Sequence, residues 1–168
     1  MCIRDRFIID TICHDEELNR LKLALKNIVS TLNGGRYALI SLSASGDVTI
    51  HSSESSKQNL IFSITHSKIE SNLKKLNKHY FAKHISSDSN TIWFKTTDRL
   101  DYILKGLQAK DDRTAQRRPK RATGLSIFLA IVLCDIGQTK NCHVVSFLSG
   151  PCTKGSGKVI SRNKKSHM

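Results

Sequence analysis

The segment whose sequence most resembles a known chemical motif is rich in glycine and lies at residues 150–158. Residues 150–158 read GPCTKGSGK, which approaches the phosphate-binding pattern G-x-x-x-x-G-K-[ST], whose backbone amides and lysine surround the phosphates of a nucleotide. In the register that starts at Gly150, Ser156 stands where the lysine is required; in the register that ends at Lys158, Cys152 stands where the first glycine is required. The sequence therefore predicts a flexible strand-end loop and no cofactor-binding residue.

A second place for chemistry is Asp10, which follows a short apolar run at residues 7–9. An aspartate at the end of a buried strand lies where open α/β sheets place their ligands. The pattern D-x-S-x-S at this point would bind Mg²⁺ through carboxylate and hydroxyl oxygens, but Ile12 and His14 replace both serines. We therefore expect no metal-binding residue, and we expect Asp10 to hydrogen-bond local backbone or to cap the following helix.

Cysteine and histidine spacing gives no further site. No two cysteines share a C-x-x-C spacing, and none of the seven histidines lies in an H-E-x-x-H pattern. We therefore expect no catalytic residue, and free, mostly packed thiols in a reducing compartment. The five cysteines are Cys2, Cys13, Cys134, Cys142 and Cys152.

The elements that would hold these residues follow from the spacing of apolar side chains. Acidic residues 15–17 begin a helix with one apolar face, and a turn at residues 45–47 joins two strands into a hairpin. Residues 79–96 show no clear periodicity, although residues 92–94 are expected to cover part of the core. The expected core strands are 7–9, 37–42, 48–50 and 144–148, and residues 60–62 could form a further short strand. The expected helices are 15–32, 67–78, 98–107 and 123–133.

The order of these elements predicts the fold class. A strand, a helix, a hairpin, further helices and a final strand are typical of a three-layer α/β domain, in which helices cover both faces of a sheet. We expect about four core strands with flanking helices, and residues 144–148 form the fourth. That number is small for such a sheet, so we also expect an exposed sheet edge and an incomplete core.

Length and charge limit the class of protein. The chain has 168 residues and a net charge of +13, which fits one basic domain. We expect no secretory signal, and no apolar run approaches the roughly 20 residues of a membrane-spanning helix. Basic clusters at residues 68–83, 113–121 and 158–165 could face nucleic acid, an anionic membrane or an acidic partner. Only 6% of the residues are aromatic, which gives base stacking little support.

The first six residues are unusual. MCIRDR is what the codons ATG TGT ATA AGA GAC AG- would encode, and those bases resemble a transposon-end adapter from sequencing libraries. We therefore expect residues 1–6 to be an artefact, residues 7–160 to be part of a domain, and residues 161–168 to be a basic, truncated tail.

Several segments, taken in order, resemble one family: the GTPase-activating subunit of the COPII inner coat, or Sec twenty-three family. The resemblance is carried by FIIDT at residues 7–11, YALISL at 37–42, RPKRATGLS at 118–126 and, most specifically, FLSGPCTKGSGKV at 147–159. It implies an incomplete von Willebrand factor A-like trunk domain that acts in protein transport from the endoplasmic reticulum to the Golgi.

In that family the trunk is a binding platform, so the resemblance implies partners and a location. The partners are the cargo-adaptor subunit, the Sar-type small GTPase and the anionic cytosolic face of the endoplasmic reticulum membrane. The resemblance implies no enzyme in this segment, because the arginine of the GTPase activator lies far downstream, and no cofactor, because the zinc-binding cysteine ribbon of the full-length protein lies upstream. The residues expected near the GTPase or membrane are Arg117, Arg118, Lys120 and Arg121.

Two other functions stay open. The alternative is an unrelated basic α/β domain that binds nucleic acid, and salt-sensitive binding to RNA or DNA would favour it. The family resemblance, in contrast, implies no nucleic-acid partner. The third is a nucleotide-dependent enzyme that uses residues 150–158, which would lose nucleotide binding in a Lys158→Ala variant.

Overall fold

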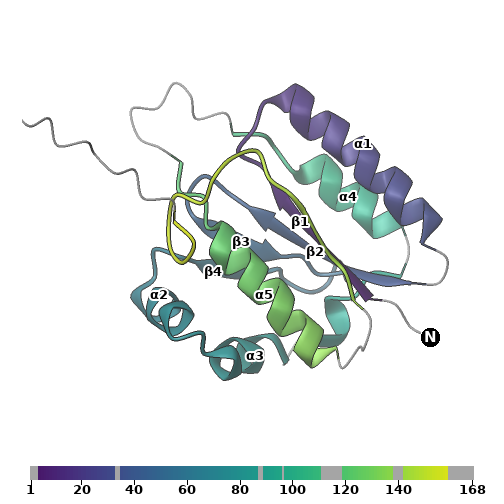
Figure 1. The fold of residues 1–168 in the computed structure, drawn as a ribbon. Coiled ribbons are helices and arrows are strands. Elements are labelled where there is room, and N and C mark those ends of the chain that lie inside the picture. Colours follow the sequence, from purple (N-terminus) through teal and green to yellow (C-terminus); the bar gives the residue numbers. More distant parts are fainter. Residues whose placement is uncertain are drawn as a thin grey trace, which may run out of the picture.

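A five-stranded mixed sheet forms the middle layer of the domain, with the strand order β4-β3-β2-β1-β5 (Figure 1). The computed structural model describes residues 4–32, 35–86, 89–95, 97–110, 119–137 and 142–158. The strands are β1 (Arg4–Asp10), β2 (Arg36–Leu42), β3 (Asp47–Ile50), β4 (Leu60–Ser63) and β5 (Val144–Phe147). The helices are α1 (Asp15–Thr31), α2 (Ser67–Lys74), α3 (Lys78–Ser86), α4 (Asp98–Gly106) and α5 (Thr123–Ile136), with a short 3₁₀ turn at Ser89–Thr91.

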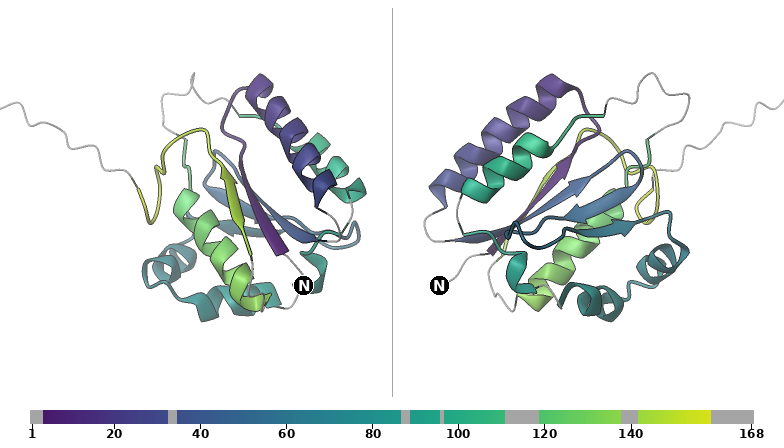
Figure 2. Two further views of the ribbon diagram at one scale, coloured as in Figure 1. Left: turned by 45° about the vertical axis from the view of Figure 1, so that its right-hand side comes forward. Right: turned by 180° about the vertical axis from the view of Figure 1, so that it is seen from behind.

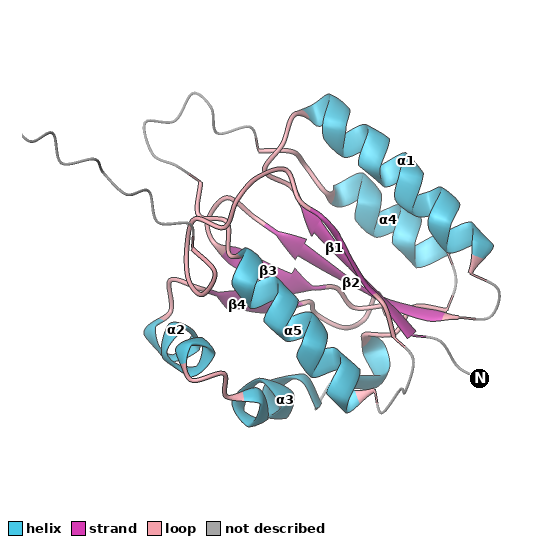
Figure 3. Cartoon of the chain, viewed as in Figure 1, coloured by secondary structure: helices cyan, strands magenta, loops and turns pink. Residues whose placement is uncertain are grey.

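Helices cover both faces of the sheet, which confirms the predicted three-layer α/β fold. Helices α1 and α4 lie side by side on one face, and α2, α3 and α5 lie on the other (Figures 1 and 2). Figure 3 shows the strands as one layer between these two groups of helices. The layers follow from alternation along each strand: Phe7 and Ile9 of β1 join the core under α1 and α4, whereas Ile8 between them joins the core under α5.

Strand β1 lies inside the sheet and pairs in parallel with β2 and with β5. The hairpin predicted from the turn at residues 45–47 is confirmed, because β2 and β3 pair antiparallel, and β4 pairs antiparallel with β3. Parallel pairing of β1 with its two neighbours brings the carboxyl ends of β1, β2 and β5 to the same edge of the sheet. That edge holds the candidate site.

Three predicted elements need correction. The basic helix predicted over residues 67–78 ends at Lys74, and a second helix, α3, begins at Lys78 and fills part of the segment 79–96 that had no clear periodicity. The chain turns between them, because Leu76 has a φ of +49°, and the Asn77 side chain accepts a hydrogen bond from the Tyr80 amide at 3.1 Å and so caps α3. The last strand is not a core strand, because Val144 and Val145 are 38% and 37% exposed at the edge of the sheet. The sheet has five strands, because the short run at residues 60–62 pairs with β3 and adds one strand to the four expected in the core.

Strand β1 also begins earlier than predicted, at Arg4. The Arg6 side chain is fully buried; its guanidinium donates to the Leu133 carbonyl at 2.9 Å and lies 4.8 Å from the centre of the Trp93 ring. Arg4 donates to the Gly137 carbonyl at 2.8 Å. Both arginines therefore bind carbonyls at the C-terminal end of α5, where positive charge is favoured.

In the described part of the chain, no helix is long and apolar enough to cross a membrane.

Candidate functional site

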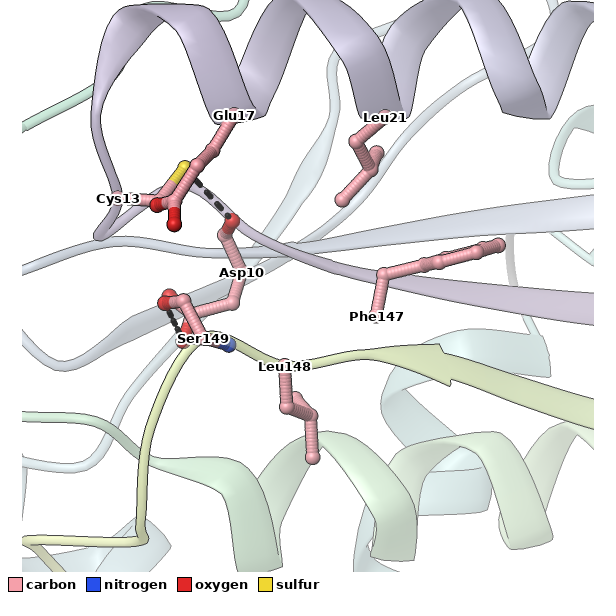
Figure 4. A pocket seen from close by; sticks show the side chains of 7 residues that line it. All are labelled: Asp10, Cys13, Glu17, Leu21, Phe147, Leu148 and Ser149. Atoms are coloured by element: carbon pink, nitrogen blue, oxygen red, sulfur yellow. Dashed lines mark hydrogen bonds between the residues drawn. The ribbon is translucent and has the colours of Figure 1, made fainter.

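A pocket of about 290 Å³ opens at the carboxyl ends of β1 and β5, beside the first turns of α1 (Figure 4). This is the place where parallel strands in an α/β sheet leave room for a ligand, and it contains Asp10, as the sequence predicted. We call it the strand-end pocket. Its lining residues are Asp10, Cys13, Glu17, Leu21, Phe147, Leu148 and Ser149.

The Asp10 carboxylate is buried and fully engaged within the protein. One oxygen accepts a hydrogen bond from the Ile12 amide at 2.9 Å, which confirms the prediction that Asp10 binds local backbone. The other oxygen accepts hydrogen bonds from Arg121 Nε at 2.9 Å and from the Ser149 hydroxyl at 2.9 Å and amide at 3.3 Å. With four donors, the carboxylate is a structural anchor and is poorly placed to bind a cation.

Arg121 comes from the segment before α5 and closes the same end of the sheet. Its side chain is only 14% exposed, and Nη2 donates to the Ile12 carbonyl at 2.7 Å and to the Ser149 hydroxyl at 3.3 Å. The Arg121 backbone is held separately, because its amide donates to the Thr153 hydroxyl at 2.8 Å. The guanidinium therefore ties β1, β5 and the segment before α5 together.

Of the four basic residues predicted near a GTPase or membrane, the two that the structure describes have different surroundings. Arg121 is the internal ion-pair partner of Asp10, and Lys120 is exposed. Arg117 and Arg118 lie outside the described residues. Whether these residues face a GTPase or a membrane stays a prediction.

The thiol in the pocket is not activated. Burial raises the pKa of Cys13 to about 11, with a further contribution from the neighbouring Asp10 carboxylate. A thiol with this pKa is protonated near neutral pH and is a weak nucleophile. Together with the apolar side chains of Leu21, Phe147 and Leu148, this makes the pocket suited to binding rather than to covalent chemistry.

The glycine-rich loop is built differently from a phosphate-binding loop. Its centre is filled by the Cys152 thiol, which lies 3.3–3.5 Å from the carbonyl oxygens of Arg121, Lys154 and Ser156. A phosphate site requires amide N–H groups that point inward, whereas these carbonyls would repel an anion. The loop also packs tightly on α5: a Cβ added at Gly124 would lie 1.9 Å from the Ser156 carbonyl oxygen.

The cysteines in the described ranges are free, as predicted. They are Cys13, Cys134, Cys142 and Cys152, whereas Cys2 lies outside the described residues. Within those ranges, no three His, Cys, Asp or Glu side chains are grouped closely enough to hold a metal ion.

Sequence reasoning placed Asp10 at this site but missed two residues that complete it. Ser149 follows a predicted strand, as Asp10 does. Because parallel strands end at the same edge of a sheet, the sequence could have indicated that these two residues lie close together. No comparable signal identified Arg121, because it belongs to a run of basic residues and lies 111 positions from Asp10.

Nearly the whole chain is similar to a segment of a larger known protein. The chain is 37% identical, over 171 aligned residues that cover 98% of it, to the GTPase-activating protein NEL1 of Saccharomyces cerevisiae. The chain is similar to part of a GTPase-activating protein. It spans only 27% of the length of that relative. No established protein-family profile matches the chain.

This match corrects the family assignment made from the sequence. The chain was expected to be a trunk fragment of the COPII inner-coat subunit, but the relative that it matches is described as GTPase-activating protein NEL1, and 27% coverage of that relative does not identify a COPII trunk. The relation to GTPase activation is retained, and the COPII assignment is wrong.

Proposed function

We propose that the chain is a binding domain of a GTPase-activating protein and that it contacts a small GTPase through the rim of the strand-end pocket. The observation that carries this proposal is the 37% identity to a GTPase-activating protein over 98% of the chain. Since a small GTPase is the substrate of every such activator, it is the partner that this similarity favours.

The chemistry of the pocket favours a docking role over a catalytic one. Activators often stabilise the charge that develops during GTP hydrolysis with an arginine supplied in trans. Arg121, which pairs with Asp10 in the pocket lining, is held by Asp10, Ile12 and Ser149 and would have to break these contacts to reach another protein. The rate acceleration is therefore assigned to a residue other than Arg121.

The rim of the pocket has the character of a protein-docking surface. Leu148 is 40% exposed at the end of β5, and the pocket behind it is lined by Leu21 and Phe147. Partly exposed apolar side chains beside a preformed pocket are typical anchors of protein interfaces. A loop of the GTPase that inserts one apolar side chain would bury this surface.

A panel of purified small GTPases, each loaded with GDP or a non-hydrolysable GTP analogue, tests the proposal by biolayer interferometry. We expect one GTPase to bind, and Leu148→Asp to weaken it by about tenfold or more, since a carboxylate replaces a buried apolar contact. Ile61→Asp is the matched control, because Ile61 is a 65% exposed apolar residue on β4, at the opposite edge of the sheet. Binding of no GTPase, or equal loss in both variants, would refute the docking surface.

We also propose that an anionic membrane surface is a partner of the basic face around α2. The glycine-rich loop packs beside α2, since a Cβ added at Gly155 would lie 3.0 Å from Ile64 and 3.7 Å from Leu73 of α2. Exposed Lys68, Lys120 and Lys158 belong to α2, the segment before α5 and this loop. Each well-placed lysine near an anionic surface contributes about 1 kcal/mol.

Sedimentation with vesicles of phosphatidylcholine, with and without phosphatidylserine, tests the membrane partner. Binding to the anionic vesicles alone is expected, with a marked loss when the three lysines are changed to glutamate. Equal sedimentation with both vesicles would refute it. The cargo adaptor and the location at the endoplasmic reticulum stay untested predictions.

A further inference from the structure

A second and larger cavity, of about 510 Å³, lies between the end of β3 and helix α4. We call it the α4 pocket. It has a different character from the strand-end pocket, because nitrogen donors and two cationic side chains line it, and no carboxylate of the described residues does. The polar residues in its lining are His51, Asn59, Arg99, Tyr102 and Lys105.

His51 is the buried polar group of this cavity. It is 6% exposed, and its Nε2 lies 2.8 Å from the Ser41 hydroxyl oxygen, whereas its Nδ1 is buried without a hydrogen-bond partner. A buried nitrogen without a partner is costly and calls for an explanation. A ligand in the cavity would supply the missing partner.

The protonation of His51 makes Nδ1 a suitable donor. Burial, together with the positive charge of Arg99, lowers the pKa of His51 to about 4, so the ring is neutral near pH 7. A neutral ring carries one N–H group. We assign to His51 the tautomer in which the Ser41 hydroxyl donates to Nε2, so that the ring hydrogen lies on Nδ1 and is available to an acceptor in the cavity.

Two cations from α4 complete the donor set. Arg99 is half-buried, its Nε has no hydrogen-bond partner, and its guanidinium carbon lies 4.6 Å from the centre of the Tyr102 ring, which holds it in place. Lys105 lies further along the same helix and is exposed. Two positive charges and one neutral donor match a dianion with three acceptor oxygens.

We propose that the α4 pocket binds a phosphate monoester of about the size of a sugar phosphate, with the phosphate against Arg99, Lys105 and His51 Nδ1 and the organic part against Tyr102 and Leu107. The cavity volume lies in the range of small-molecule sites. The absence of a lining carboxylate among the described residues removes the main source of repulsion. This site is independent of GTPase binding at the strand-end pocket.

Isothermal titration of the whole chain with glucose 6-phosphate, glucose and inorganic phosphate, at constant ionic strength, tests the proposal. We expect saturable one-to-one binding of glucose 6-phosphate, no binding of glucose, and weaker binding of inorganic phosphate. Arg99→Gln should weaken binding by about tenfold, the effect of losing one charge-assisted hydrogen bond. Lys105→Gln should also weaken it, whereas Lys75→Gln, a change of an exposed lysine outside the lining, should not.

Imidazole NMR distinguishes this site from adsorption to the basic surface. Saturation with glucose 6-phosphate should shift the His51 ring resonances, because the ligand accepts a hydrogen bond from Nδ1. An unsaturable titration, an unchanged His51 resonance, equal loss in the Lys75→Gln control, or equal affinity for inorganic phosphate would overturn the proposed site and ligand.

Discussion

The ion pair between Arg121 and Asp10 offers the sharpest test of how this end of the sheet is held together. Arg121→Met keeps the length and most of the apolar surface of the side chain but removes the donor that lies 2.9 Å from the buried Asp10 carboxylate. The Arg121 amide keeps its hydrogen bond to the Thr153 hydroxyl, and the Arg121 carbonyl keeps those from the amides of residues 153 and 154, because none of these involves the Arg121 side chain. The variant therefore removes the guanidinium, with its bonds to Asp10, Ile12 and Ser149, and leaves the backbone contacts of residue 121 in place.

The expected loss follows from the burial of Asp10. Removing one partner of a buried ion pair usually costs about 3–5 kcal/mol, because the remaining charge is uncompensated. Asp10 retains three donors from Ile12 and Ser149, and Arg121 is 14% exposed, so the lower end applies. We expect a decrease of about 3 kcal/mol in the free energy of unfolding.

Urea denaturation followed by the fluorescence of Trp93, the single tryptophan, measures this loss. Adding Asp10→Asn to Arg121→Met removes the unpaired charge, so the double variant should recover at least about 1 kcal/mol relative to the sum of the single losses. Arg20→Met is the control: the Arg20–Glu16 pair is exposed on α1, and its loss should stay within about 0.5 kcal/mol. A loss below about 1 kcal/mol for Arg121→Met, or additive single variants, would refute this account.

Three further predictions address the packing, the titration and the thiols. Gly124→Ala should lower the free energy of unfolding by about 1–3 kcal/mol, because the added Cβ would overlap the Ser156 carbonyl, and this outweighs the better helix propensity of alanine. Gly106→Ala is the control: no atom lies within 4 Å of its added Cβ, so the free energy of unfolding should not fall. Burial lowers the pKa of His51 from 6.5 to about 4, so the neutral ring contributes about 3 kcal/mol to the free energy of unfolding above pH 6.5, and this contribution is lost as the pH falls to 4. Urea denaturation at several pH values across this range should show the loss, and a His51→Gln variant should not show it. The Cys13 thiol, with its pKa raised to about 11, should resist iodoacetamide at pH 8 until urea unfolds the chain, and rapid labelling of the folded chain would contradict its burial.

The layers of the fold were predictable because apolar periodicity encodes burial directly. The continuous apolar run at residues 7–9 indicates a strand buried on both faces, and the nearly continuous apolar run at residues 123–133 indicates a helix against a sheet; β1 and α5 are these elements. The burial of β5 was not predictable in this way. Val144 and Val145 have the composition of a core strand, but in the described part of the chain β5 pairs with β1 alone, and strand order is not encoded by composition.

The site could be predicted only in part, for a reason visible in Arg121 and Arg6. Both are basic residues near other charges in the sequence, a pattern that usually indicates a solvated surface. Their burial depends on acceptors that only the tertiary fold brings near: the Asp10 carboxylate 111 positions away for Arg121, and the Leu133 carbonyl 127 positions away for Arg6. Local spacing contains no information about such partners.

The place of Arg121 also separates the two proposed binding functions. An open α/β sheet usually leaves a crevice for a ligand at this edge. Here the Arg121 guanidinium fills part of it and donates to acceptors within the protein, so the remaining surface of the strand-end pocket is mainly apolar and lies around Leu148. Two nitrogens without a hydrogen-bond partner, His51 Nδ1 and Arg99 Nε, lie instead at the α4 pocket. Because the two pockets share no lining residue, Arg99→Gln should leave the affinity for a GTPase unchanged, and Leu148→Asp should leave the affinity for glucose 6-phosphate unchanged. A loss of both affinities in either variant would show that the two sites are coupled through the sheet.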